Sequence, residues 1–390
     1  MQFSDYGLTE DQRALCQSVR DLCGKYPENY WKERDEKGEY PHDFINALTE
    51  GGFLAALIPE KYGGLGLGIK EGCLILEEIN RSGGNAAPGH AQMYIMGTLL
   101  RHGSEEQKEA YLPEIASGKL RLQAFGVTEP DAGTDSTRIT TFAERKGSKY
   151  IINGRKVFIS RVLQSDMMLL LCRTTPRDQV EKRHDGMSVL LVDLNRAKGN
   201  GLEVNPLDIM VNHHSNELVF DNLEVSTENL IGEEGKGFQY ILSSMNAERI
   251  LCASESIGDG RYFVEKAVGY ANQREVFGRK IGQNQGIQFP LARAYSAVEA
   301  ARLMRDKAAD MFDEGQNPGQ EANMAKFLSS EAAWQAANAC MDTFGGYAYH
   351  RDYHIERKFR EVRLMQTAPI SNNLVLSFLG QNVLGLPRSF

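Results

Sequence analysis

Glu248 is a candidate for a reactive group because of its type and its surroundings. It lies within the stretch Gly235–Gln285, in a run that is apolar at helical spacing and has no proline before Pro290. The residues one helical turn away are uncharged: Ser244, Met245, Leu251 and Cys252. Burial on such a face raises a carboxyl pKa toward the working pH, which a general base requires. The same pattern also fits a structural ion pair, and Arg249, about 100° round the helix, does not decide between them.

Basic residues follow at the end of the same stretch. Arg274, Arg279 and Lys280 surround a turn at Gly278. Cations near a helix C-terminus suit the helix dipole, so a charged cap is one interpretation. The other is a clamp for pyrophosphate, in which Arg274 is a bidentate ligand.

A third candidate is the small-residue loop in Phe125–Asp135. Its backbone N–H groups, with the hydroxyls of Thr128 and Thr134, could meet the polar edge or the phosphates of a cofactor. A strand that ends in a proline turn explains the same residues. The loop does not decide between these two interpretations.

Composition excludes several classes of protein. The 390 residues carry a net charge of −8, which argues against a nucleic-acid binder or a polybasic membrane protein. No apolar run approaches the ~20 residues that span a bilayer, and Met1–Tyr6 lacks the features of an export signal. The six cysteines have no CxxC spacing and His213-His214 has no matching acidic set. We therefore expect reduced thiols, a cytoplasmic location and no metal site.

Residues 1–120 are predicted to form an N-terminal α-helical domain. Thr9 with Gln12, and Ser104 with Gln107, have the spacing of capping boxes. The glycine cluster at 63–68 is not GxGxxG and follows no clear strand, so it predicts an interhelical loop.

Residues 121–233 are predicted to form a β domain, an antiparallel sandwich or barrel. Asn153-Gly154 between β-prone runs predicts a two-residue hairpin turn. Short turn-bounded runs without helices between them predict further strands at Met167–Arg173, Met187–Leu194, Gly201–Val204 and Leu218–Phe220.

Residues 234–390 are predicted to form a C-terminal four-helix bundle. The expected helices are Phe238–Arg274, Ile287–Glu314, Gln320–Phe344 and Asp352–Leu364, with a tail helix near Asn373–Val383. The fold class is therefore α+β, in the order α, β, α.

Several separated motifs together resemble the acyl-CoA dehydrogenase family. They are Val127-Thr128-Glu129-Pro130 with Ala132-Gly133-Thr134-Asp135, Phe158-Ile159-Ser160, Arg274 with Phe277-Gly278, and Phe344-Gly345-Gly346-Tyr347 with Asp352, Arg357 and Glu361. The likeness covers nearly the whole chain and keeps the motif order.

The resemblance implies FAD bound between the β domain and the C-terminal bundle, within a homotetramer (or a homodimer). It implies flavin contacts from Phe125, Val127, Thr128, Gly133, Thr134, Phe158 and Ser160, and a further cofactor contact from Ser371. It also implies that Arg274, Phe277, Gln285 and Gly346 reach the FAD of a neighbouring subunit. Thr134 and Arg249 are the substrate contacts that it suggests.

The family's chemistry removes an α-proton and a β-hydride from an acyl-CoA thioester and gives the trans-2-enoyl-CoA. Most members take the base from a Tyr-Glu-Gly-Thr loop, but here Pro369 stands at that glutamate's position. A minority that includes isovaleryl- and long-chain-type enzymes resembles this chain in carrying Glu-Arg on the helix after the β domain. Glu248 is therefore the expected base, with Arg249 as an organiser of the site.

Other departures indicate a distinct subfamily. Pro369 lacks the N–H that in the family helps to bind the thioester carbonyl. Arg161-Val162-Leu163 replaces a glycine-containing turn, and Asp342 and Ala348 stand where Gln and Gly are common.

The expected function is an FAD-dependent acyl-CoA dehydrogenase that passes electrons to an electron-transferring flavoprotein. The length favours this over the related oxidases, which carry a further domain. The alternatives are a flavin-dependent monooxygenase or nitroalkane-oxidase-like enzyme of the same fold, and a non-catalytic acyl-CoA-binding homologue. Glu248 beside Arg249 argues against the monooxygenase.

Overall fold

The computed structural model describes residue 5 and residues 7–388. The sequence predicts no export signal in Met1–Tyr6. Residues 1–4 and 6 of that segment lie outside the described residues. The chain divides into two compact units. One comprises Met1–Phe44, Gly68–Ala86 and Asn246–Phe390, and the other comprises Ile45–Leu67 and Ala87–Met245.

Helices build the first unit. They are α1 (Glu10–Cys23), α2 (Glu28–Lys37), α4 (Ile69–Arg81), most of α8 (Gly237–Ala271), α9 (Gln285–Asp313), α10 (Gly319–Phe344), α11 (Ile355–Leu364) and α12 (Asn372–Phe378), and a turn of π-helix follows at Leu379–Val383. The helix α3 (His42–Glu50) spans the boundary between the units. The capping box predicted at Thr9 is confirmed, because the Gln12 N–H donates to Thr9 Oγ1 and the Thr9 N–H donates to Gln12 Oε1.

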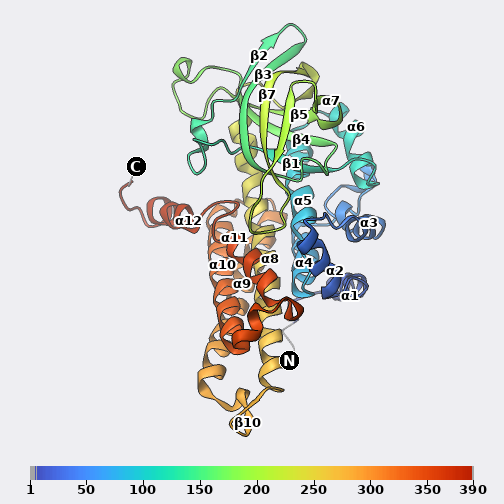
Figure 1. Ribbon diagram of the computed structural model, residues 1–390. Coiled ribbons are helices and arrows are strands. Elements are labelled where there is room, and N and C mark those ends of the chain that lie inside the picture. Colours follow the sequence, from blue (N-terminus) through green and yellow to red (C-terminus); the bar gives the residue numbers. More distant parts are fainter. Residues whose placement is uncertain (1–4, 6, 389–390) are drawn as a thin grey trace. The chain divides into compact units, whose positions relative to one another are not determined.

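The long helices α8, α9 and α10 run side by side in this unit (Figure 1). Alanines at 325, 332, 333, 336 and 337 on α10 are buried, which lets the helix backbones approach closely. Their core also includes Phe263 and Val362. The predicted α8 is three residues too long: the helix ends at Ala271, and the β9–β10 hairpin (Glu275–Val276 with Arg279–Lys280) connects it to α9.

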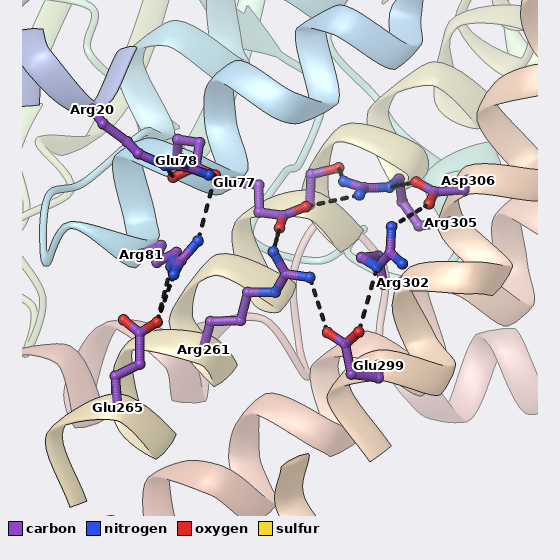
Figure 2. Close-up of polar contacts among 11 residues, drawn as sticks. Arg20, Glu77, Glu78, Arg81, Arg261, Glu265, Glu299, Arg302, Arg305 and Asp306 are labelled. Atoms are coloured by element: carbon purple, nitrogen blue, oxygen red, sulfur yellow. Dashed lines mark hydrogen bonds and ion pairs between the residues drawn. The ribbon is translucent and has the colours of Figure 1, made fainter. Parts of the chain in front are cut away.

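A buried network of charges ties α4, α8 and α9 together (Figure 2). Glu77 of α4 is 2% exposed and forms ion pairs with Arg261 of α8 at 2.5 Å and with Arg305 of α9 at 2.7 Å. Glu299 of α9 extends the network by pairing with Arg261 at 2.9 Å. Burial acts to raise the pKa of Glu77, but the two guanidinium groups outweigh it and hold that pKa below its ordinary value. The carboxylate is therefore ionised and its charge is matched within the core.

A mixed sheet forms the centre of the second unit. Its strands are β1 (Leu122–Gly126), β2 (Phe142–Lys146), β3 (Lys149–Ser160), β4 (Met167–Arg173), β5 (Met187–Asp193), β6 (Leu202–Pro206), β7 (Ser215–Ser226) and β8 (Leu230–Ile231). Their order is β6-β7-β3-β2-β4-β5-β8, with β1 beside β4. Most neighbours are antiparallel, as expected, but β1 and β2 each pair with β4 in parallel. Helices α5 (Ala87–His102), α6 (Glu105–Ala116) and the short α7 (Leu194–Ala197) complete the unit, together with the first residues of α8.

Strand β4 lies between two hydrophobic clusters. Leu169 and Leu171 face one cluster, while Met168 and Leu170 face the other. Because successive side chains point to opposite faces of a sheet, a strand with both faces covered must be apolar throughout. That is why β4 appears in the sequence as a continuous apolar run.

The prediction of a hairpin turn at Asn153-Gly154 is wrong. Both residues lie inside β3, and the chain turns instead at Gly147-Ser148, between β2 and β3. The pairing of β3 with β7 shifts register between Ile152 and Gly154. A Cβ on Gly154 would lie 2.6 Å from Thr141 Cα, so the glycine permits a close approach between backbones at an irregular point of the ladder.

The six cysteines are free and buried, as the sequence predicts. Among the described residues, no helix is both long enough and apolar enough to cross a membrane.

We predict that Glu77→Gln destabilises the protein by about 3–5 kcal/mol, because the change leaves Arg261 and Arg305 in the core without their shared carboxylate. Denaturant unfolding followed by circular dichroism measures the loss. The control is Lys307→Met, which removes an ion pair to Glu321 from a lysine side chain that is 58% exposed, and should cost about 0–1 kcal/mol. Equal losses in the two variants would contradict this role of the network.

Candidate active site

The loop after β1 presents several of the predicted cofactor contacts. Glu129 and Ala132 exchange backbone hydrogen bonds at 3.1 Å and close a tight turn. Gly133 and Thr134 lie exposed beyond it, and a Cβ on Gly133 would meet nothing within 4 Å. Phe125, Val127 and Thr128 precede the turn and are half-buried. The loop therefore has an open side that small groups line.

A buried ion pair fixes this loop to the sheet. Lys156 of β3 is fully buried, and its Nζ donates to Glu129 Oε1 at 2.9 Å and to the Val127 carbonyl at 2.8 Å. Glu129 also accepts from the N–H groups of Thr140 and Thr141 at 2.7 and 2.9 Å. Burial acts to raise the pKa of Glu129, but Lys156 and these donors hold it below its ordinary value.

Phe158 and Ser160 lie at the end of β3, where the backbone is strained. Phe158 has a φ of +59° and is 62% exposed, although β3 buries the neighbouring Ile159. Arg161, the first residue of the segment that replaces a glycine-containing turn, has a φ of +58° and is buried. Such a conformation costs a non-glycine residue roughly 1–3 kcal/mol. This end of β3 is therefore held in place by its surroundings.

Glu248 and Arg249 lie on α8 in the first unit, and both are half-buried. Arg249 Nη1 donates to Asn246 Oδ1 at 3.1 Å, while its buried Nε has no hydrogen-bond partner among the described residues. Burial lowers the pKa of Arg249, and the attraction of Glu248 opposes that shift. The pair thus places opposite charges next to each other in a poorly solvated part of the helix.

The 365–371 loop, which connects α11 to α12, packs against the same part of α8. Cys252 Sγ lies 3.6 Å from Met365 Sδ and 3.9 Å from the Ala368 carbonyl oxygen. Cys252 is one helical turn after Glu248 and therefore shares its face of α8. The loop that carries Pro369 therefore packs against α8 one helical turn from Glu248.

The residues expected to contact a neighbouring subunit's cofactor are exposed. Phe277, at the tip of the β9–β10 hairpin, is fully exposed and has a φ of +52°. The Arg274 guanidinium lies 5.9 Å from the centre of the Tyr347 ring, so the hairpin and the Gly346 segment lie together. Gln285 and Gly346 are also exposed, and Ser371 caps α12 by accepting from the Leu374 N–H.

Sequence reasoning missed the buried groups that hold these loops. Lys156 and Lys326 of α10 are both fully buried lysines that bind loop carbonyl oxygens. A lysine at an inward position of a strand was a usable signal for Lys156. No such signal exists for Lys326, because its partners lie about 45 residues further along the chain.

Family models match nearly the whole chain. The acyl-CoA dehydrogenase N-terminal domain matches residues 9–119, the middle domain matches residues 124–223, and the C-terminal domain matches residues 235–383.

Relatives and solved structures agree with these models. An acyl-CoA dehydrogenase from Bacillus subtilis is 35% identical over 97% of this chain and 99% of its own length. The structure of butyryl-CoA dehydrogenase from Megasphaera elsdenii is 30% identical and superposes with a TM-score of 0.91, over 98% of this chain and all of that one. A chain from a structural study of the electron transferring flavoprotein of Acidaminococcus fermentans is 32% identical, with a TM-score of 0.90 over 98% of this chain and all of that one.

The family is FAD-dependent, and the residues present here fit a flavin. Phe158 offers an exposed aromatic face, and Thr134 offers an exposed hydroxyl beside the open space at Gly133. Arg274 supplies an exposed guanidinium, the group best suited to a pyrophosphate.

We predict that Glu129→Gln weakens FAD binding by roughly tenfold, about 1.4 kcal/mol, because it leaves Lys156 buried without a carboxylate and loosens the loop. Equilibrium titration of the apoprotein with FAD, followed by flavin fluorescence, measures the change. Glu144→Gln, which removes an exposed carboxylate paired with Lys146 on β2, is the control and should bind FAD normally. An unchanged affinity in Glu129→Gln would contradict this role of the ion pair.

The same pair predicts a pH dependence of stability. Because the pKa of folded Glu129 lies below the ordinary value of 4.5, its contribution is complete above about pH 4.5. It is lost as the pH falls through the folded pKa. The difference in unfolding free energy between the wild type and Glu129→Gln should therefore be constant from pH 5 to 7 and shrink below about pH 4.5. A difference that grows on acidification would contradict the ionised state of Glu129.

Proposed function

The chain belongs to the acyl-CoA dehydrogenase family, and on that premise we propose that it oxidises an acyl-CoA thioester to the trans-2-enoyl-CoA with Glu248 as the base. The observation that carries the proposal is the packing of the 365–371 loop against α8. Pro369 occupies the loop position at which most of the family carries its catalytic glutamate. Cys252, in contact with that loop, stands one turn from Glu248. A carboxylate is therefore supplied to the same region from α8.

Glu248 takes the α-proton in this proposal. The α-proton of a thioester is acidic only when the developing enolate is stabilised, so the carboxylate must lie beside the α-carbon in a site from which water is excluded. Glu248 is half-buried, so part of its side chain is already shielded from water. FAD, when bound, accepts the β-hydride.

Arg249 organises the base in this proposal. Its guanidinium is adjacent to Glu248 in the chain, is largely desolvated, and has a hydrogen bond only to the neutral Asn246 among the described residues. The positive charge of Arg249 attracts the Glu248 carboxylate and favours its ionised form. That is the form a base must have before it abstracts a proton.

We also propose the cofactor contacts and the assembly that the family implies. Phe125, Val127, Thr128, Gly133, Thr134, Phe158 and Ser160 contact the flavin or its ribityl chain, and Ser371 makes a further contact. Arg274, Phe277, Gln285 and Gly346 reach the FAD of a neighbouring subunit in a homotetramer. The full exposure of Phe277 supports this, because a phenylalanine ring at a hairpin tip gains stability only when a partner covers it.

The proposed electron acceptor is an electron-transferring flavoprotein. The similarity to a chain from a structural study of such a flavoprotein supports this choice. A base on the helix rather than on the loop is compatible with branched or bulky acyl groups, so we propose a substrate of that kind.

We predict that Glu248→Gln retains FAD and acyl-CoA binding but slows flavin reduction by about 10²–10⁴-fold, the usual contribution of a general base. Stopped-flow absorbance under anaerobic conditions measures the rate. Glu265→Gln, a change on the same helix of a carboxylate that pairs with Arg81, is the control and should reduce at the wild-type rate. Near-normal reduction of Glu248→Gln would assign the base to another residue.

We further predict that a panel of acyl-CoAs, titrated anaerobically into the wild-type protein, bleaches the flavin, with isovaleryl-CoA more effective than straight-chain thioesters. A strict preference for straight chains would contradict the proposed substrate class but not the reaction. No bleaching by any thioester, together with oxygen chemistry on a nitroalkane or on the separately reduced flavin, would contradict the reaction itself.

A further inference from the structure

Lys326 is a fully buried lysine whose hydrogen bonds go to neutral acceptors. It lies on α10 and is 0% exposed. Its Nζ donates to the Ile370 carbonyl oxygen at 2.7 Å and to Asn372 Oδ1 at 2.7 Å. Among the described residues no acidic side chain forms an ion pair with it, and burial lowers its pKa.

A buried lysine stabilises a core poorly. Burying an ammonium group costs free energy that two neutral acceptors recover only in part, and an apolar side chain of similar volume is often as good for stability. Stability alone therefore does not explain a lysine at this position. What the amine provides, and an apolar side chain cannot, is a directed bond to the backbone of one particular loop.

That loop is the 365–371 loop, and it is held from two sides. Lys326 binds its end at Ile370, and Ser330 of α10 donates to the same Asn372 oxygen at 3.1 Å. On the other side, Cys252 of α8 contacts Met365 and Ala368. Pro369, between these two anchors, is the residue that stands in place of the family's usual base.

Glu331 of α10 completes the attachment. Its Oε1 accepts from Gln366 Nε2 at 2.8 Å and from Asn372 Nδ2 at 2.7 Å. The same carboxylate oxygen therefore binds two side chains, of which Gln366 lies at the start of the loop and Asn372 lies just beyond its end. The 365–371 loop is therefore fixed relative to α10 at both ends. Among these α10 residues, Lys326 is the anchor that bonds to the loop backbone, and Cys252 of α8 contacts that backbone from the other side.

We propose that Lys326 is a positioning residue for the reaction: by holding the Ile370 carbonyl, it sets the distance between the 365–371 loop and the Glu248 face of α8, and so seats the thioester against the base. This inference rests on the proposed function. Lys326 does not touch the substrate. It acts through the loop, and a displacement of about 1 Å in such a loop can cost about 100-fold in rate.

The test compares Lys326→Met, Lys326→Arg and Ser330→Ala as FAD-loaded proteins. Each is mixed anaerobically with the acyl-CoA that reduces the wild-type flavin fastest, and the limiting reduction rate and the apparent dissociation constant are measured separately. Thermal unfolding and flavin content are recorded for each variant. Ser330→Ala is the matched control, because it removes a bond to Asn372 and leaves the Lys326–Ile370 bond intact.

We expect Lys326→Met to lower the limiting rate by roughly 10–100-fold, with bound FAD retained and the apparent dissociation constant changed much less. Lys326→Arg, which keeps a buried donor, should recover part of the rate, and Ser330→Ala should resemble the wild type. A wild-type rate in Lys326→Met would overturn the inference, as would a loss that follows thermal stability equally in all three variants. A wild-type protein that no acyl-CoA reduces would instead overturn the proposed function, and this inference with it.

Discussion

The ion pairs of Glu77 with Arg261 and Arg305 are the interaction on which the helical unit of the structure depends. They lock α8 to α4 and α9 through buried charges that match one another. Because α8 is thereby fixed, residues on it have a defined direction, including Glu248, which lies about three and a half turns before Arg261. The 365–371 loop then packs on that fixed helix through Cys252. The position of the candidate base is thus set by buried electrostatics some distance from it.

The two units solve a similar problem in similar ways. Each must hold a loop of small or apolar residues still, although such loops gain little from their own packing. In the second unit Lys156 binds the Val127 carbonyl and pairs with Glu129. In the first, Lys326 binds the Ile370 carbonyl without a carboxylate of its own. The ammonium group of lysine has three donors and stands at the end of a long side chain. A lysine on a helix or strand can therefore bond to the backbone oxygens of a loop that passes over it.

Much of the fold follows from local sequence patterns, and the failures have a common cause. Helix ends with capping residues, such as Thr9 and Ser104, were predictable because the signal lies within four residues. The strand β4 was predictable because both of its faces are apolar. The hairpin at Asn153-Gly154 failed because the same dipeptide that favours a turn also suits a strand position where Thr141 approaches too closely for a side chain. The contact that decided the outcome is not local.

In the candidate site, too, some features follow from local sequence and others depend on tertiary contacts. The motifs around Gly133, Arg274 and Gly346 could be found by their order along the chain, and Glu248 could be found by the absence of a glutamate at Pro369. The anchoring by Lys326, Glu331 and Cys252 could not, since it depends on tertiary contacts between α8, α10 and the loop before α12. Sequence patterns therefore identify the candidate groups, while packing determines where they are held.

A crystal structure of the FAD-loaded protein with a bound acyl-CoA or enoyl-CoA would show whether Glu248 is the base. We expect a carboxylate oxygen of Glu248 to lie about 3–3.5 Å from the α-carbon, the separation of a group poised for proton transfer. We also expect the 365–371 loop, with Pro369, to form the adjacent wall. An α-carbon out of reach of Glu248, with another acidic or basic side chain beside it, would contradict the role of Glu248 as the base.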